Sequence, residues 1–525
     1  MAALSIHTID PLRSVAQHRL RSVALCTDAD SPRWPAANQQ PRGGGLRATL
    51  GLAASRSVAL HFLNLPDIVR AALAGNVTVM TSPAFALNRF GLGARPDDAP
   101  PADPQRWLLA QLDSYEPLPA DWKPLARTPE LIDVWNNMQR SVRQAPEGQR
   151  SGIREGYLRE GSRDYQAAVG ARTTSALQTS TPFVERLVHF WSNHFAVSVD
   201  KLLIVGLAGS FEADAIRPHV LGRFEDLLVA VVRHPAMLLY LDQAQSIGPG
   251  SVMGSRGRGL NENLAREIFE LHTLGVRSGY TQEDVKEFAR ALTGWTLPGD
   301  GGTTGGATFR FVPAMHEPGS RTVLGKTYSD AGETQARSVI HDLVAAPATA
   351  LHVARKLARH FVSDDPPQAL VQRLAETFAR TSGDLASIYR ELIASPDAWQ
   401  PAAAKFKSPW DWAISSLRAL GRRSMAPTQA ANLMTQLGQP VWRPGSPAGY
   451  SDTAATWAAP DALMRRVEVA QRLAQEAGDA ADARSLAPRV LLGALTEATA
   501  TAIARAESGG TAIALLLVSP EFLRR

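Results

Sequence analysis

The sequence has 525 residues, a net charge of +5 and 45% hydrophobic residues, which suits a globular protein of one or more domains. It contains no apolar run near the roughly 18–20 residues that span a bilayer, which excludes a transmembrane helix. Residues 1–79 carry eight arginines, four aspartates and no lysine or glutamate, so the rest of the chain has a net charge of only +1. That balance offers no clustered basic surface for nucleic acid.

Residues 1–79 differ from the rest of the chain. They hold the only cysteine, Cys26, and show no sustained periodicity, whereas the residues after Met80 read like the start of a folded domain. We therefore expect 1–79 to be a mis-called N-terminal extension, with a genuine disordered arm as the alternative. Residues 80–525 are expected to form a helical domain, and a division into two helical subdomains near 298–330 stays open. The absence of cysteine after residue 80 excludes thiolate zinc and iron–sulfur sites there.

Helical signals dominate the chain. Capping residues, helix-starting prolines and apolar spacing predict helices over 180–191, 211–232 with a break near 218–222, 260–274, 281–292, 347–362, 367–393, 409–420, 461–477 and 487–506. The only strand signal is a short hairpin pairing 308–312 with 321–324. Gly-rich loops cover 247–259 and 298–306. The predicted fold class is mainly α, a large multi-helix globular body with long Gly/Pro loops and at most one short β-hairpin near 308–324.

The strongest chemical feature is the polar helix Asn261–His272. Helical spacing puts Asn263, Glu267 and Glu270 on one face, and burying two carboxylates requires a cation or another partner. One hypothesis is a divalent metal site in which Glu267 and Glu270 are oxygen ligands and His194 and His316 add nitrogens. The metal would activate water for hydrolysis, with a carboxylate of Glu267 or Glu270 accepting the proton and Asn263 beside them.

The alternative is a structural network in a non-catalytic binding or assembly protein. Glu267 and Glu270 would then pair with Arg266, Arg290 or Lys356, and Asn261 would cap the helix. His272 lies off the acidic face, so we expect it to make a hydrogen bond at the helix end near Gly275.

Two further groups are candidates for substrate binding. Arg355, Lys356, Arg359 and His360 form a basic strip that suits an anion, or else a solvated face. Tyr450, Asp452 and Trp457 lie in a Gly/Pro-containing loop and suit a sugar or another polar ligand, or else pin that loop to the core.

The sequence resembles the bacterial family called domain of unknown function 1800, over about residues 84–525. The resemblance is carried by the segments Leu87–Gly93, Phe190–Val197, Pro235–Asp242, Asn261–Gly275, Gly279–Trp295, His316, Ala354–Lys356, Lys407–Pro409 and Gly449–Asp452 with Trp457. It implies a helical fold and no settled activity. It also implies a sulfatase-like partner protein, because relatives are often encoded beside one. Many relatives have His-Asn-His or His-Asp-His where this chain has Ser192-Asn193-His194, so one of two paired histidines is missing here.

Overall fold

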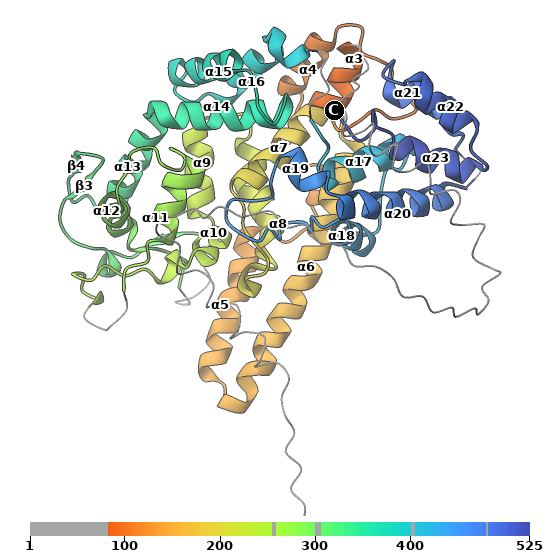
Figure 1. The fold of residues 1–525 in the computed structure, drawn as a ribbon. Coiled ribbons are helices and arrows are strands. Elements are labelled where there is room, and N and C mark those ends of the chain that lie inside the picture. Colours follow the sequence, from red (N-terminus) through yellow and green to blue (C-terminus); the bar gives the residue numbers. More distant parts are fainter. Residues whose placement is uncertain (1–81, 255–258, 300–305, 401–404, 479–480) are drawn as a thin grey trace, which may run out of the picture. The chain divides into compact units, whose positions relative to one another are not determined.

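The computed structural model describes residues 82–254, 259–299, 306–400, 405–478 and 481–525 (Figure 1). All of these residues belong to one structural unit, residues 63–525. The expectations for residues 1–79 and for Cys26 lie outside the described residues.

The described chain is built almost entirely from helices, which confirms the predicted fold class (Figure 1). The α-helices are α3 (Ser82–Ala84), α4 (Pro104–Asp113), α5 (Thr128–Gln144), α6 (Arg150–Gln178), α7 (Pro182–His194), α8 (Leu207–Phe211), α9 (Phe224–Arg233), α10 (Pro235–Tyr240), α11 (Asn263–Glu267), α12 (Gln282–Leu292), α13 (Glu333–Ala345), α14 (Pro347–Phe361), α15 (Gln368–Arg380), α16 (Leu385–Ala394), α17 (Pro409–Ala419), α18 (Pro427–Gln436), α19 (Ala454–Trp457), α20 (Pro460–Ala477), α21 (Ala483–Leu491), α22 (Glu497–Ala504) and α23 (Gly509–Leu517). Turns of π-helix cover Phe85–Phe90, Glu212–Ile216 and Ile268–His272.

Local signals account for several helix boundaries. At the start of α12 the Thr281 hydroxyl accepts from the Asp284 amide at 3.1 Å, and the Asp284 carboxylate accepts from the Thr281 amide at 2.7 Å, which is the predicted capping box. The single helix predicted over 367–393 is wrong. Ser382 and Gly383 have φ of +52° and +76°, and these left-handed residues separate α15 from α16.

The strands form two small antiparallel pairs within the described residues, and the predicted pairing of 308–312 with 321–324 is wrong. Strand β1 (Trp295–Thr296) pairs with β2 (Arg310–Phe311), so the first predicted strand folds back onto the end of α12. Strand β3 (Arg321–Val323) pairs with β4 (Lys326–Tyr328) through Leu324 and Gly325. Both turn residues have positive φ, +51° and +76°, which is the two-residue turn that closes the tightest hairpins.

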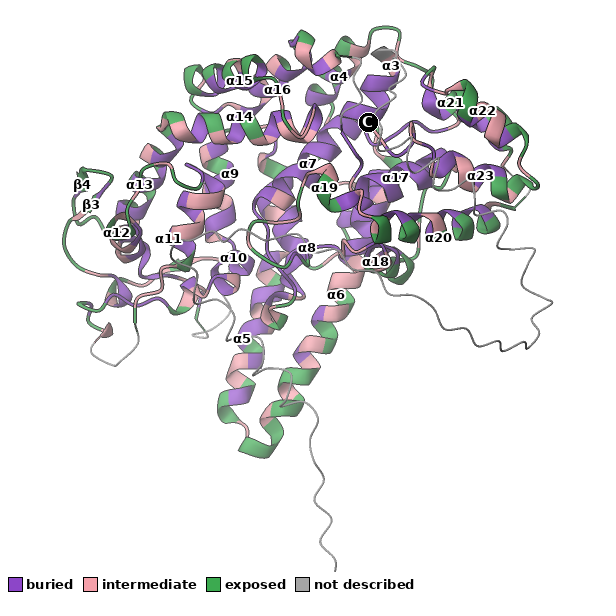
Figure 2. Ribbon diagram, in the orientation of Figure 1, coloured by how far each residue is buried: buried purple, intermediate pink, exposed green. Residues whose placement is uncertain are grey.

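Helix α7 lies at the centre of the buried core. Every residue of α7 except Asn193 is buried, and Figure 2 shows the helix in the buried colour along its length. The buried apolar side chains form two clusters, one drawn from residues 86–398 and the other from 84–213 and 406–523. The stretches on both sides of the proposed 298–330 boundary contribute to the first cluster, and a subdomain division there stays a prediction. Among the described residues, no helix has the length and apolar character needed to cross a membrane.

Candidate functional site

A cavity of about 290 Å³ lies where α7, α14, the start of α17 and the loop 437–453 meet, and we call it the α7–α14 pocket. Its lining includes eight charged or titratable side chains together with one tyrosine: Arg172, His189, His194, Lys356, Arg359, His360, Asp411, Asp452 and Tyr450. Six of these were candidates from the sequence, and the structure brings them together: His194, Lys356, Arg359, His360, Tyr450 and Asp452.

The buried polar side chains of α7 are held by partners from distant segments. His189 Nδ1 accepts a hydrogen bond from Trp410 Nε1 at 3.1 Å, and burial, aided by Arg172, lowers the pKa of His189 to about 4. Ser192 Oγ accepts from Trp442 Nε1 at 3.2 Å. The serine that replaces the first histidine of many relatives therefore anchors a tryptophan in this chain.

A reciprocal hydrogen-bonded pair joins α7 to the loop 437–453. Asn193 Nδ2 donates to the Tyr450 carbonyl at 2.9 Å, and the Tyr450 amide donates to Asn193 Oδ1 at 2.8 Å. Gly449 has φ of +78°, and a Cβ there would lie 2.3 Å from the Asn193 carbonyl oxygen. Only glycine satisfies both the positive φ and this close approach. The Gly449–Asp452 segment is therefore placed against the pocket by its backbone.

The aromatic side chains of this loop serve mainly to hold it. The Tyr450 hydroxyl donates to the Pro440 carbonyl at 2.6 Å, and Trp457 Nε1 donates to the Ser451 carbonyl at 2.7 Å. Their rings lie 6.3 Å apart. Tyr450 lines the pocket, whereas Trp457 is buried behind it, so a direct substrate contact by Trp457 has no support from this arrangement.

Helix α14 contributes two of the pocket's cations, Lys356 and Arg359, together with His360. These three residues recur at helical spacing on one face, and the adjoining face buries Val353, Leu357 and other apolar residues. Lys356 makes no hydrogen bond or ion pair with the described residues. Burial lowers its pKa to about 8, with Arg359 adding to the decrease and Asp452 opposing it. Within the described part of the chain, the Lys356 ammonium group thus lines the pocket without an ion-pair partner, although Asp452 lies near enough to raise its pKa.

His360 and Asp452 form a hydrogen-bonded pair. His360 Nδ1 lies 2.8 Å from Asp452 Oδ2, while His360 Nε2 is buried without a partner in the described structure. Burial lowers the pKa of His360 more than Asp452 raises it, so the ring is neutral near pH 7. Burial raises the pKa of Asp452, but His360 and Lys405 bring it down to about 2, so this carboxylate is ionised. An Nδ1–H that donates to this carboxylate leaves Nε2 as an unprotonated acceptor.

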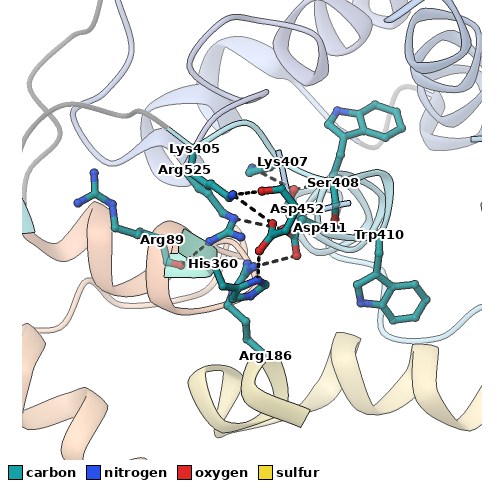
Figure 3. A network of polar contacts seen from close by, with 12 residues as sticks. Arg89, Arg186, His360, Lys405, Lys407, Ser408, Trp410, Asp411, Asp452 and Arg525 are labelled. Carbon is teal, nitrogen blue, oxygen red and sulfur yellow. Dashed lines mark hydrogen bonds and ion pairs between the residues drawn. The ribbon is translucent and has the colours of Figure 1, made fainter. Parts of the chain in front are cut away.

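Two carboxylates of the pocket wall each pair with buried cations (Figure 3). Asp411 accepts from Arg186 at 2.8 Å and pairs with Arg525 at 3.2 Å. Asp452 pairs with Lys405 at 3.2 Å in addition to His360. Because Lys405 also holds Asp452, the carboxylate keeps the His360 ring in one orientation.

His194 and His360 both lie close to the ring of Phe190. The ring centroid of Phe190 is 6.2 Å from that of His194 and 5.3 Å from that of His360. His194 Nε2 lies 3.2 Å from the carbonyl oxygen of His272, and its Nδ1 is buried without a partner in the described structure. Burial, followed by Lys356, holds the pKa of His194 well below its ordinary value. The neutral ring therefore donates from Nε2 and leaves a second free acceptor at Nδ1.

The predicted metal ligands do not assemble. Among the described residues, no three His, Cys, Asp or Glu side chains are grouped so that they could hold a metal ion. His316 Nδ1 lies 2.9 Å from the Thr293 carbonyl oxygen, and its ring packs on Phe311 at 5.3 Å. His316 thus fastens its own loop to the end of α12 and does not line the pocket. The Nε2 atom of His194 is already used in the hydrogen bond to the His272 carbonyl.

The acidic face of the Asn261–His272 segment lies outside the lining of the pocket. Asn263 is exposed, and Glu267 and Glu270 are half-buried. Arg266 lies 3.5 Å from Glu270, and Asn261 Oδ1 accepts from the Asn263 amide at 2.8 Å. The Arg266 pair matches part of the alternative network. Asn261 is not the helix cap, because Glu262 occupies the N-cap position and Asn261 binds the first helical amide from one residue earlier. The prediction that the His272 ring makes a hydrogen bond at the helix end is wrong at Nδ1, because this atom is buried and has no partner in the described structure.

Glu267→Gln should stabilise the protein by about 1 kcal/mol at pH 8 and by less than about 0.4 kcal/mol at pH 4.5. Burial and then Glu270 raise the pKa of Glu267 to about 6 in the folded state, so the ionised form is penalised above pH 6 and the penalty disappears below the unfolded pKa. Urea unfolding at the two pH values measures this difference. Glu283→Gln, at a side chain that is 64% exposed, is the control and should change stability by less than about 0.5 kcal/mol at either pH.

Sequence reasoning missed the buried half of the site. It did not link His360 to Asp452, and it overlooked Arg186, Trp410 and Asp411. A usable signal exists for Arg186, because the mainly apolar stretch Phe183–Trp191 also holds Glu185 and His189, and polar side chains buried with such a helix must find partners.

A family model described as "Protein of unknown function (DUF1800)" matches residues 85–524, nearly the whole described chain. No curated protein and no solved structure gives a significant match. The match confirms the resemblance seen in the sequence and covers every segment of the α7–α14 pocket. The chain therefore belongs to the DUF1800 family of proteins of unknown function.

Proposed function

We propose that this protein is a hydrolase that binds a small anionic substrate in the α7–α14 pocket and uses His360 as the general base. The observation that carries the proposal is the 2.8 Å contact between His360 Nδ1 and Asp452 Oδ2 with Nε2 left without a partner. A carboxylate behind a neutral imidazole fixes its tautomer and stabilises the imidazolium formed when the ring takes a proton. In this proposal His360 is the general base, in place of Glu267 or Glu270, which were the candidates from the sequence.

The pocket's charge supports an anionic substrate. Lys356 contributes an ammonium group without an ion-pair partner in the described structure, and Arg359 binds the Asp364 carbonyl only through Nε, at 3.0 Å. Leaving a cation unpaired in a buried site costs free energy that a bound anion offsets. The cavity of about 290 Å³ lies near the lower end of the usual range for small-molecule sites, roughly 300–1,000 Å³.

The reaction follows from these positions. His360 Nε2 removes a proton from water while the water oxygen bonds to the electrophilic atom of the substrate. The imidazolium then returns this proton to the leaving group as its bond breaks. Lys356 and Arg359 hold the substrate anion and stabilise the negative charge that develops during the attack.

Activity in a metabolite extract, followed by mass spectrometry, tests the proposal. The wild type should consume at least one anion and form products that together equal that anion plus water. His360→Gln should react about 10²–10⁴-fold more slowly, because it removes the base. The rate at low substrate should fall on the acid side, as Nε2 becomes protonated, and above about pH 8, as Lys356 loses its charge.

His341→Gln is the matched control, because His341 is 66% exposed and pairs with Glu225 on the surface. It should react at the wild-type rate. The proposal is wrong if the wild type leaves the extract unchanged, or if His360→Gln consumes the substrate as fast as the wild type does.

A further inference from the structure

The polar groups of the pocket wall that lack a partner within the protein indicate what kind of ligand the pocket binds. Most neutral polar side chains on its wall are already engaged within the protein. Ser192 accepts from Trp442, the Tyr450 hydroxyl donates to Pro440, and both ends of the Asn193 amide bind Tyr450. These groups hold the wall together and have little capacity left for a ligand.

Two acceptors on the wall, His194 Nδ1 and His360 Nε2, and the ammonium group of Lys356 have no hydrogen-bond or ion-pair partner among the described residues. A third imidazole nitrogen on the wall, His189 Nε2, also makes no hydrogen bond there, but it lies 3.6 Å from Glu185 Oε1. The His194 and His360 nitrogens are hidden from bulk solvent, and a buried acceptor without a donor costs free energy until one arrives. The complement of this set is a molecule with hydrogen-bond donors and a negative charge.

The tautomer of His194 is set by the π-helical turn Ile268–His272. The free carbonyls at the end of this turn accept from two histidines: Leu271 from His352 Nε2 at 3.0 Å, and His272 from His194 Nε2 at 3.2 Å. His194 must therefore carry its proton on Nε2 and can only accept at Nδ1. In this way the Asn261–His272 segment acts on the pocket through a backbone carbonyl.

We infer that the α7–α14 pocket binds a polyhydroxylated anion, such as a sugar acid or a sugar phosphate, whose hydroxyl groups donate to His194 and whose anionic group contacts Lys356. Hydroxyl groups are neutral donors, and a ligand that carries several of them beside an anionic group can satisfy an uncharged imidazole acceptor and a cation together. Phe190, which lies close to both histidines and is itself part of the wall, provides an apolar ring for the C–H face of such a molecule. This inference rests on the proposed function for the location of the site, and it adds the substrate class.

Isothermal titration calorimetry with matched ligand pairs tests the inference without turnover. The panel contains sugar acids with their fatty-acid counterparts of equal length, and sugar phosphates with inorganic phosphate and alkyl phosphates. We expect at least one hydroxylated anion to bind the wild type about tenfold more tightly than its deoxygenated partner. If the preference appears among the sugar acids, the anionic group of the ligand is a carboxylate. If it appears among the sugar phosphates, that group is a phosphate. Neutral sugars should bind more weakly than either.

His194→Phe should remove the preference by weakening the hydroxylated ligand roughly 3- to 10-fold, while the deoxygenated anion binds as before. His272→Phe is the matched control, because His272 contributes its backbone carbonyl rather than its ring and does not line the pocket. It should keep the wild-type preference. The inference is overturned if no hydroxylated anion is preferred by the wild type, or if His194→Phe keeps the full preference.

These outcomes are separable from those of the proposed function. A preference for hydroxylated anions together with full activity of His360→Gln would reject His360 as the base and retain the ligand class. Loss of activity in His360→Gln without any such preference would retain the base and reject the ligand class.

Discussion

Asp411→Asn should lower the free energy of unfolding by about 3–5 kcal/mol, a cost typical of breaking a buried ion pair. Asp411 is 6% exposed and accepts from Arg186 at 2.8 Å while pairing with Arg525 at 3.2 Å. Burial raises its pKa, but Arg186 and Arg525 hold it well below the ordinary value. Asparagine keeps the shape of the side chain and removes the charge, so two buried guanidinium groups lose their shared carboxylate. Urea unfolding at pH 7 measures the change.

The pH dependence of this effect has a definite sign. Because the folded-state pKa of Asp411 is depressed, its stabilising contribution is complete above the unfolded pKa of about 4 and is lost as the pH falls. The deficit of Asp411→Asn should therefore shrink in acid. The control is Asp461→Asn, at an ion pair with Arg465 whose carboxylate side chain is 68% exposed, and it should change stability by less than about 0.5 kcal/mol. Equal effects of the two substitutions would show that the buried network does not stabilise the fold.

Lys356→Met should have opposite effects on stability and on ligand binding. It should stabilise the unliganded protein by about 1 kcal/mol, because methionine fills similar space without a half-buried, unpaired charge. The same change should weaken binding of any anion in the pocket by at least about tenfold, since charge-assisted hydrogen bonds contribute about 1.5–3 kcal/mol. Thermal unfolding with and without the anion measures both effects in one experiment.

The stabilisation by Lys356→Met should be largest below about pH 8 and should fade as the pH rises toward the unfolded lysine pKa of about 10.4. This sign follows because the folded state binds the Lys356 proton more weakly than the unfolded state does. Arg355→Met is the matched control, on the same helix with an exposed side chain, and should leave both properties nearly unchanged. A destabilised Lys356→Met protein would mean that the ammonium group has a structural role.

The helices that could be predicted from the sequence are those whose start is marked by residues close together in the chain. The Thr281–Asp284 capping box and the proline at the start of α14 each act within one turn. Helix α6 was not predicted, because it meets different neighbours along its length and has no continuous apolar stripe. Gly161 packs against Gly206, and Gly170 packs against Pro427. A periodic pattern cannot report a helix whose buried side changes from one turn to the next.

The candidate site was predicted in part for a similar reason. Residue type singled out Lys356, Tyr450 and Asp452, and they line one pocket, while their ligand stays a prediction. Helical spacing placed Glu267 and Glu270 on one face, but spacing says nothing about what that face meets in the fold. His360 and Asp452 are 92 residues apart in the chain, so only long-range packing reveals them as a pair.

The paired amide contact between Asn193 and Tyr450 has a kinetic consequence. It joins residues 257 positions apart, so one wall of the pocket comes from the middle of the chain and the other from its last quarter. Closing a loop of that length costs chain entropy that grows only slowly with length, but contacts of high sequence separation form slowly. The pocket is therefore expected to form late in folding, after most helices exist. A chain that has not yet docked its last quarter would be helical and compact, yet unable to bind a ligand.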